Sequence, residues 1–284
     1  MRNTVSCIIR TYNEAKYAGK LIEALHSQNG ACEHLEIVVV DSGSTDATVE
    51  IARNCGARLI EIPKKDFNYS KALNLGIENS MGDLILILSA HSMPCENDWL
   101  LRMVRHFENG NVAGVFCRQV PWPDADAHEI IRIEKTFGPV SETFDGSSGH
   151  RDIPFSNAAS CIRRGVWREH PFVVMPAAED REWARWAIVH GYEIVYEAEA
   201  AVYHSHNESC RKTSQRKIQI EKAADAKLLR KRDFFFTVRQ ALGWLVRDSV
   251  KVYSSDYFRS TRMRDLWKCA LRSFWFVVDF NQKS

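Results

Sequence analysis

The segment Leu35–Asp46, with the sequence Leu-Glu-Ile-Val-Val-Val-Asp-Ser-Gly-Ser-Thr-Asp, decides the fold of this chain. Its apolar run Ile37–Val40 is too short for a helix and rich in β-branched residues, which is typical of a buried parallel strand. The run ends abruptly at Asp41, and a Ser-Gly-Ser turn leads into a helical pattern. Because α/β proteins bind ligands at the carboxyl ends of parallel strands, Asp41 is placed to contact a ribose or a base. The alternative is that Asp41 only ends the strand and that Asp46 only caps the helix.

The composition is that of a soluble globular protein. The chain has 284 residues, of which 45% are hydrophobic and 26% charged, enough for one large domain or a domain with an extension. Its eight cysteines include no Cys-x-x-Cys pair, so we expect reduced thiols and a cytoplasmic location. We find no signal peptide at the N-terminus and no apolar stretch long enough to span a bilayer.

Charge divides the chain into two parts. Residues 211–284 contain 18 Lys and Arg against 7 Asp and Glu, a net charge of +11, whereas residues 1–210 carry −9. The composition therefore predicts a domain over 1–210 and a basic extension over 211–284, which shows only helical patterning. A basic extension favours an anionic partner.

Strand and helix patterns alternate through the first half of the chain. This order predicts a mostly parallel central sheet flanked by helices, an α/β fold. The expected strands are Val5–Arg10, Ile37–Val40, Ala57–Ile62, Leu84–Leu88, Val112–Gln119 and Phe155–Arg163, with short ones at Ile194-Val195 and Ala201–Tyr203. The expected helices include Tyr69–Asn79, Glu96–Phe107, Glu129–Phe137 and Ala178–His190.

Four of these strands end in polar clusters, at Thr11–Glu14, Asp41–Asp46, Ser89–Ser92 and His204–Asn207. Any one of them is unremarkable, since polar residues are common at strand ends. Together they would fall on one edge of the sheet, and that convergence predicts a polar ligand site.

The order of motifs resembles a family-2 glycosyltransferase of the GT-A fold. The similarity rests on Thr-Tyr-Asn-Glu after the first strand, Val-Asp-Ser-Gly-Ser-Thr-Asp, Lys-Ala-Leu-Asn-Leu-Gly from Lys71, a Glu-Asp pair opening a helix, and a closing Tyr-His-Ser-His-Asn. It covers about residues 4–210. The closing motif is similar to bacterial rhamnosyltransferase-like members.

The resemblance implies a binding site for a nucleotide-diphosphate sugar, with a uridine or thymidine donor. Its nucleotide-binding residues would be Thr11, Tyr12 and Glu14 on base and ribose, Asp41 on the base with Ser42 and Ser44 nearby, and Lys71, Ser89 and Ala90 toward the diphosphate. Asn157 would line the donor-sugar pocket, and the loop Gly138–Arg151, with His150 and Arg151, would close over the donor.

The chain departs from the family where an Asp-x-Asp motif normally holds a divalent metal. Here the tripeptide is Ser89-Ala90-His91, and both carboxylates are missing. Two alternatives follow. His91 with His204 or His206 forms a metal site better suited to Mn²⁺ than to Mg²⁺. Otherwise the site is metal-free, and cationic side chains face the diphosphate.

Glu179 and Asp180 stand where the family keeps its catalytic base. An inverting transferase must take the proton of the attacking acceptor hydroxyl, and a carboxylate suits that task. Asp180 is the candidate and Glu179 the second choice. The alternative role for Asp180 is that of a helix N-cap.

The expected activity is therefore inverting transfer of a hexosyl-type sugar to an acceptor hydroxyl, in polysaccharide or glycan synthesis. One rival is a nucleotide-sugar binding protein that has lost catalysis with its Asp-x-Asp motif. The sequence contains no nucleic-acid recognition motif, and no Gly-x-Gly-x-x-Gly follows the first strand as in a Rossmann dehydrogenase. The extension is expected to meet a membrane surface, the catalytic domain or a second copy.

Overall fold

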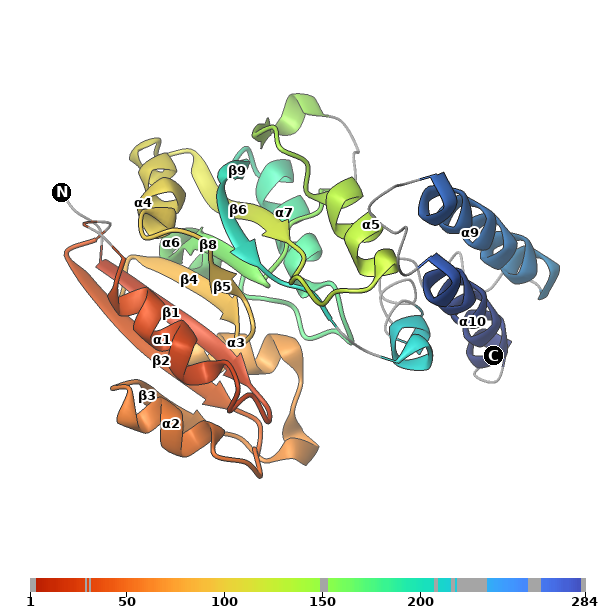
Figure 1. Ribbon diagram of the computed structural model, residues 1–284. Helices are drawn as coiled ribbons and strands as arrows, with labels where there is room; N and C mark the ends of the chain where they lie inside the picture. Colours follow the sequence, from red (N-terminus) through yellow and green to blue (C-terminus); the bar gives the residue numbers. More distant parts are fainter. Residues whose placement is uncertain are drawn as a thin grey trace. The chain divides into compact units, whose positions relative to one another are not determined.

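A computed structural model describes residues 4–28, 30, 32–148, 153–206, 209–215, 218, 234–254 and 262–281 (Figure 1). The chain forms two compact units. The first consists of residues 1–120, 137–175 and 179–204, and the second of residues 121–136, 176–178 and 205–284. The C-terminal segment of the second unit thus begins at residue 205, six residues before the predicted extension. The unit also includes residues 121–136 and 176–178.

The first unit is built on a nine-stranded sheet with the order β3-β2-β1-β4-β8-β6-β9-β5, and β7 pairs with β9. The strands are β1 Thr4–Thr11, β2 His34–Asp41, β3 Arg58–Glu61, β4 Leu84–Ser89, β5 Met93–Pro94, β6 Val112–Val120, β7 Glu142–Phe144, β8 Ala159–Arg163 and β9 Glu193–Tyr203. The helices of this unit are α1 Ala18–His26, α2 Thr48–Asn54, α3 Tyr69–Glu78, α4 Trp99–Val104, α6 Arg164–Glu169 and α7 Glu179–Val189.

The expected parallel sheet is present in β3, β2, β1 and β4, which pair in parallel. In the second half β8 runs antiparallel to both β4 and β6, so the sheet is mixed. Since β8 is antiparallel to both of its neighbours, β4 and β6 run in the same direction. Strand β9 is parallel to β6, so β9 ends at the same edge as β1, β2 and β4. The predicted convergence of strand ends therefore holds despite the antiparallel strand.

Side chains that alternate along β1 pack against helices on both faces of the sheet. Cys7 and Ile9 join a buried cluster with Leu21, Ile22 and Leu25 of α1. Ile8 faces α3, where Gly76 leaves so little room that an added Cβ would lie 2.6 Å from Cγ2 of Ile8. The start of α3 lies near the carboxyl edge of β1, where the Arg10 guanidinium is 5.0 Å from the ring centroid of Tyr69.

The two short strands predicted at Ile194-Val195 and Ala201–Tyr203 are parts of one long strand, β9. Its register against β6 shifts between Cys117/Glu197 and Arg118/Ala201, which is a bulge in β9. Glu197 is the last paired residue before this bulge and is 2% exposed. Its carboxylate accepts bonds from the Glu199 amide (2.9 Å), Ser141 (3.0 Å) and Arg105 (2.9 Å), and lies 2.7 Å from Nε2 of His106. The polar residues Glu197 and Glu199 interrupt the apolar pattern of β9, so the sequence predicted two short strands instead of one.

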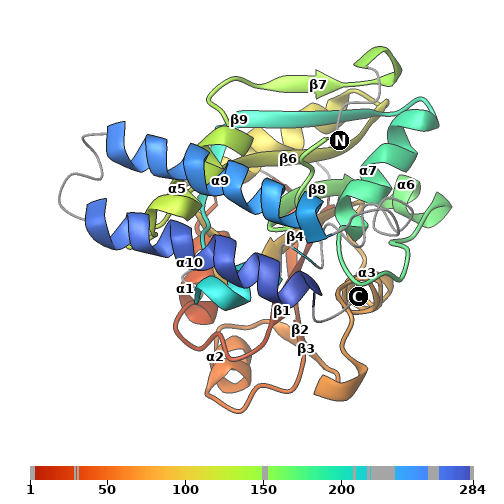
Figure 2. The same cartoon turned by 90° about the vertical axis from the view of Figure 1, so that its right-hand side faces the viewer.

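The described helices of the second unit include α5 Ala127–Thr136, α9 Phe234–Ser254 and α10 Arg262–Asn281. Helices α9 and α10 lie side by side (Figures 1 and 2). Buried Ala127, Ile130 and Ile131 of α5 cluster with Val252 of α9 and Cys269 of α10. The predicted helical character of the extension is confirmed for these segments.

Candidate active site

The polar clusters lie at one edge of the first unit's sheet. Thr11 pairs with Asp41 across β1 and β2, and Arg10 pairs with Ser89 across β1 and β4. His204 follows β9 directly, and its backbone amide donates to the carbonyl of Val120 at 2.9 Å. The carboxyl ends of four strands thus surround one site, as ligand sites in α/β proteins require.

Asp41 organises the loop after β2. It is 1% exposed. One carboxylate oxygen accepts from the amides of Gly43 (3.0 Å) and Ser44 (2.7 Å), and the other from the hydroxyls of Thr11 (2.7 Å) and Ser44 (2.5 Å). The Ser42 hydroxyl in turn donates to the Thr11 carbonyl at 2.9 Å. Four donors therefore hold Asp41, and the loop is rigid before any ligand arrives.

Tyr12 and a lysine that sequence reasoning missed flank this loop. The Tyr12 side chain is 38% exposed. The Lys64 ammonium contacts its hydroxyl and lies 4.3 Å from its ring centroid, so an aromatic ring and a cation lie together beside the residues predicted to bind the nucleotide. Lys71 lines a separate groove of about 370 Å³ between α3 and the loop after β3. Asn74 in that groove binds the Phe172 carbonyl (2.8 Å) through its amide group.

Two histidines lie together, His91 in the loop after β4 and His204 directly after β9. The rings of His91 and His204 stack with centroids 5.0 Å apart and an interplanar angle of 11°. Nδ1 of His91 lies 3.1 Å from the Glu14 carboxylate, and Nδ1 of His204 lies 2.8 Å from the amide oxygen of Gln119. Glu14, in the loop between β1 and α1, thus brings a carboxylate to His91. The pairing was not foreseen, because the two residues are 77 positions apart in the sequence.

This arrangement fits a metal ion that accepts imidazole. The ligand nitrogens of His91 and His204 lie within 4.8 Å of each other. Metal-binding histidines typically donate their other ring nitrogen to an oxygen, as Nδ1 of both rings can here. His206 lies two residues beyond His204, and since consecutive Cα atoms are about 3.8 Å apart the chain itself keeps it near. Ser89, half-buried, and Ala90, buried in the turn, offer no carboxylate, so Mg²⁺ fits poorly.

The acidic pair opens α7. Helix α7 begins at Glu179, so Asp180 stands in its first turn and not at the preceding residue expected of an N-cap. One oxygen of Asp180 accepts from the Asn157 amide (3.1 Å) and the other from the Arg181 amide (2.8 Å). Before the pair, Ala178 has a φ of 68°, a backbone conformation that costs a non-glycine residue about 1 kcal/mol. The carboxylate of Asp180 is therefore fixed in orientation by the backbone.

Asn157, predicted in the donor-sugar pocket, is 1% exposed. Its backbone amide binds Asp180, and its side-chain oxygen accepts from the Ser160 hydroxyl at 2.9 Å. Asn157 therefore positions Asp180 through its backbone amide, a role that was not predicted. The predicted loop Gly138–Arg151 contains β7, and His150 and Arg151 lie outside the described residues.

Arg10 is the second functional candidate that sequence reasoning missed. Its guanidinium lies 3.5 Å from the Glu179 carboxylate and 5.0 Å from the ring centroid of Tyr69, and its side chain is 14% exposed. Burial and the neighbouring Asp180 raise the pKa of Glu179, and Arg10 opposes them. Burial also raises the pKa of Asp180, against the amides of Asn157 and Arg181 and the charges of Arg181 and Arg10.

Replacing Arg10 by Gln should move the acidic limb of the pH–activity profile to higher pH. Removing the cation raises the pKa of both carboxyl groups further, so the base is protonated at a pH where it is ionised in the wild type. We expect a several-fold loss of kcat at pH 6 and little loss at pH 9. The control is Arg58→Gln, which removes another arginine–glutamate pair (3.0 Å). An unchanged profile in Arg10→Gln would show that Arg10 does not act on the acids.

Comparison with known proteins now gives the family. Residues 6–165 match the family model described as Glycosyl transferase family 2. The chain belongs to glycosyl transferase family 2. It is 30% identical to the O-antigen chain rhamnosyltransferase RfbN of Salmonella typhimurium over 226 residues, 75% of this chain and 69% of that protein. It is 30% identical to the O-antigen chain rhamnosyltransferase WbaN of Salmonella anatum, over 74% and 68%.

Solved structures of glycosyltransferases share the fold of this chain. The mannosyltransferase PcManGT of Pyrobaculum calidifontis, solved with GDP-Man and Mn²⁺, aligns with a TM-score of 0.66 at 18% identity and covers 97% of this chain and 88% of that one. The S. aureus TarS fragment 1–349 with UDP-GlcNAc aligns with a TM-score of 0.58 at 17% identity, over 96% and 73%. The predicted GT-A fold with a C-terminal helical region is confirmed.

Proposed function

We propose that this glycosyltransferase is an inverting enzyme that transfers a sugar from a nucleotide-diphosphate donor to an acceptor hydroxyl, with Asp180 as the base. The observation that carries the proposal is the position of Asp180. Its carboxylate is held by two backbone amides at the sheet edge where Thr11, Asp41 and His204 also lie. The rhamnosyltransferase relatives act on O-antigen chains by their names, which supports polysaccharide synthesis as the setting.

The reaction is a single displacement. The acceptor oxygen attacks the anomeric carbon from the face opposite the nucleotide, and the bond from that carbon to the phosphate oxygen breaks. Asp180 takes the hydroxyl proton as the new bond forms, and the nucleoside diphosphate leaves with the electron pair. A raised pKa makes Asp180 a stronger base than an ordinary carboxylate. Glu179, tied to Arg10, is the second choice for this role.

The two ends of the donor meet different groups. In this proposal Tyr12 and the Asp41 loop bind the base and ribose, and the paired histidines bind the diphosphate. His91 and His204 would hold a Mn²⁺-like ion, with His206 as a third ligand. When bound, such an ion supplies positive charge to the leaving diphosphate. Without one, the imidazoles stabilise that charge when protonated, donating from Nε2.

Calorimetric binding of nucleoside diphosphates tests the proposal. UDP, dTDP, GDP and ADP are each titrated with EDTA and with Mn²⁺. We expect one of them to bind at micromolar Kd, because the Asp41 loop is already formed. A more than tenfold gain with Mn²⁺ would establish a histidine metal site, and equal binding in EDTA would establish the metal-free alternative.

Two outcomes would contradict the proposal. If no nucleotide binds to the folded protein, it is not a nucleotide-sugar transferase. If a nucleotide binds tightly but its sugar conjugate is never consumed with any acceptor, and Asp180→Asn binds it equally, the chain is a nucleotide-sugar binding protein without catalysis.

A further inference from the structure

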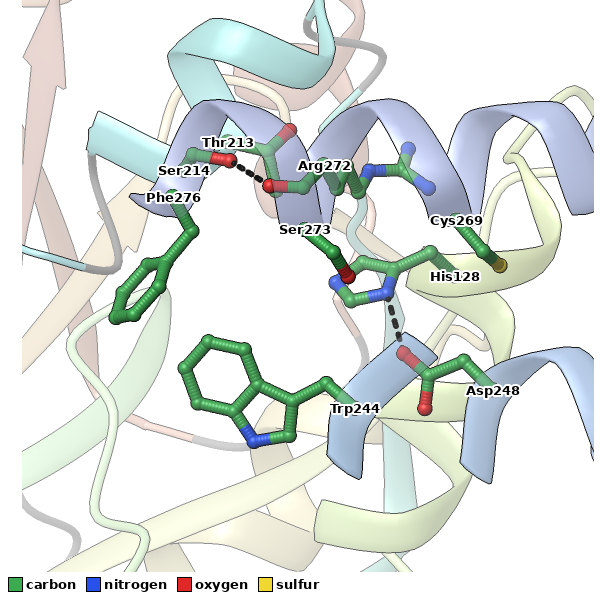
Figure 3. A pocket seen from close by; sticks show the side chains of 9 residues that line it. All are labelled: His128, Thr213, Ser214, Trp244, Asp248, Cys269, Arg272, Ser273 and Phe276. Atoms are coloured by element: carbon green, nitrogen blue, oxygen red, sulfur yellow. Dashed lines mark hydrogen bonds and ion pairs between the residues drawn. The ribbon is translucent and has the colours of Figure 1, made fainter. Parts of the chain in front are cut away.

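On α9 and α10 the acidic side chains are buried in the second unit, whereas several basic side chains are exposed. The three acidic residues of these helices, Asp248, Asp265 and Asp279, are each 2–3% exposed. Figure 3 shows Asp248 bonded to His128, at 3.1 Å, and Asp279 pairs with Arg211 at 3.2 Å. The cavity beside Asp248 holds only about 20 Å³, the room of about one water. Asp248 also pairs with Arg247 at 2.8 Å, and Asp265 lies 3.5 Å from Arg264. Each of the three acids is therefore buried beside a cation.

The surfaces of the same helices are apolar and basic. In α9 the large apolar side chains exposed by more than half recur at helical spacing: Leu242, Val246, Val250 and Tyr253. In α10 the corresponding stripe is Met263, Trp267 and Phe274, with exposed fractions of 80%, 66% and 58%. Residues three, four or seven apart share one helix face, so each helix presents a continuous apolar stripe to solvent.

Basic side chains flank both stripes. Arg239 and Lys251 of α9 are exposed, and Arg264 of α10 is 63% exposed. Arg247 and Lys268 are partly exposed, at 43% and 34%, and pair with the buried Asp248 (2.8 Å) and Asp126 (3.6 Å). Residues 211–284 as a whole carry a net charge of +11. None of the described helices has the length and low charge needed to cross a bilayer.

We infer that α9 and α10 form a docking surface that lies on an anionic lipid bilayer, with the two apolar stripes in the acyl boundary and the basic side chains among the headgroups. Apolar stripes bordered by Lys and Arg are what interfacial helices present to a membrane, and each basic residue near an anionic surface adds to the attraction. The inference deepens the proposed function by naming the surface where an acceptor would be met, and it does not depend on transfer activity.

A second copy of the chain fits this surface less well. A two-fold interface would place the same patch on both sides. The basic side chains would then face each other, with the acids of both helices buried and already paired. Like charges across an interface oppose association. Charge complementarity therefore favours an anionic lipid surface.

Vesicle co-sedimentation of the full chain tests the inference. We expect binding to vesicles of phosphatidylglycerol and phosphatidylcholine in equal parts, and at least tenfold weaker binding to phosphatidylcholine alone. Raising NaCl from 0.1 to 0.5 M should weaken binding several-fold. Val246→Ser combined with Trp267→Ser should lower the partition coefficient at least tenfold. The matched control, Met81→Ser with Val189→Ser, removes side chains exposed by 84% and 76% in the first unit and should bind as the wild type.

Three results would overturn it. These are no binding to anionic vesicles, equal loss in the control pair, or a dimer in solution that Val246→Ser with Trp267→Ser converts to a monomer without vesicle binding. The last would assign the surface to self-association. Nucleotide calorimetry on the same variants separates this question from the proposed function, because a lost membrane surface leaves Kd for the nucleotide unchanged.

Discussion

Replacing Asp180 by Asn should lower kcat by about 10²–10⁴-fold and leave the Kd for the nucleoside diphosphate within about twofold. A positioned general base contributes about 10²–10⁴ to the rate, and an amide cannot take the proton. Asn keeps one oxygen to accept from the Asn157 or Arg181 amide, so the backbone around α7 should be maintained. Single-turnover rates with the donor identified by calorimetry, together with melting curves, measure both effects.

The matched control is Glu182→Gln, two residues along the same helix, where the carboxylate lies 3.1 Å from His170. It should retain nearly full activity. If Asp180→Asn keeps wild-type turnover while Glu179→Gln loses it, the base is Glu179 and the Arg10 ion pair orients the catalytic group itself. If both variants keep turnover, no carboxylate of this pair acts as the base.

The sequence indicated the strand ends better than the contacts between them. Asp41, Ser89 and His204 could be placed at one edge because an apolar run ending in a polar cluster is a local pattern. Arg10 and Glu197 could not be singled out, since each owes its role to partners far away in the chain. From the sequence, Arg10 is only the last residue of a predicted strand. Its partner Glu179, on α7, is 169 positions later in the chain.

The mixed second half of the sheet shows the same limit. The spacing of Val112–Gln119 and Phe155–Arg163 predicts strands but not their direction, because direction depends on which neighbours they pair with. The division at residue 210 followed charge. The second unit also includes α5, whose apolar face packs on Val252 and Cys269. This is a tertiary contact, which the amino-acid composition cannot predict.

Glu197→Gln should destabilise the first unit by about 3 kcal/mol at pH 7. Burial alone would raise the pKa of Glu197, but bonds from the Glu199 amide, His106, Arg105 and Ser141 outweigh it and lower the pKa from 4.5 to about 2. A lowering of that size is worth about 3 kcal/mol in the ionised state. For a unit of this length the melting temperature should fall by roughly 6–12 °C.

The effect must depend on pH in one direction. Because the pKa is lowered on folding, the contribution of Glu197 is complete above its unfolded pKa of 4.5 and is lost as pH falls from there toward about 2. The melting temperatures of Glu197→Gln and wild type should therefore approach each other as the pH falls from 4.5 toward about 2. Glu199→Gln is the control, since its carboxylate is 68% exposed and should change stability by less than about 0.5 kcal/mol.

The same variant connects stability to the site. The Glu197 carboxylate fixes the bulge that redirects the end of β9, and His204 follows that end directly. A loosened bulge should displace His204 from His91, so Glu197→Gln should weaken nucleotide binding in Mn²⁺ more than the Glu199→Gln control does, measured by calorimetry at 20 °C, well below the melting temperature. A variant that melts as the wild type at pH 7, or whose deficit persists unchanged at pH 3, would show that the buried carboxylate does not hold the bulge.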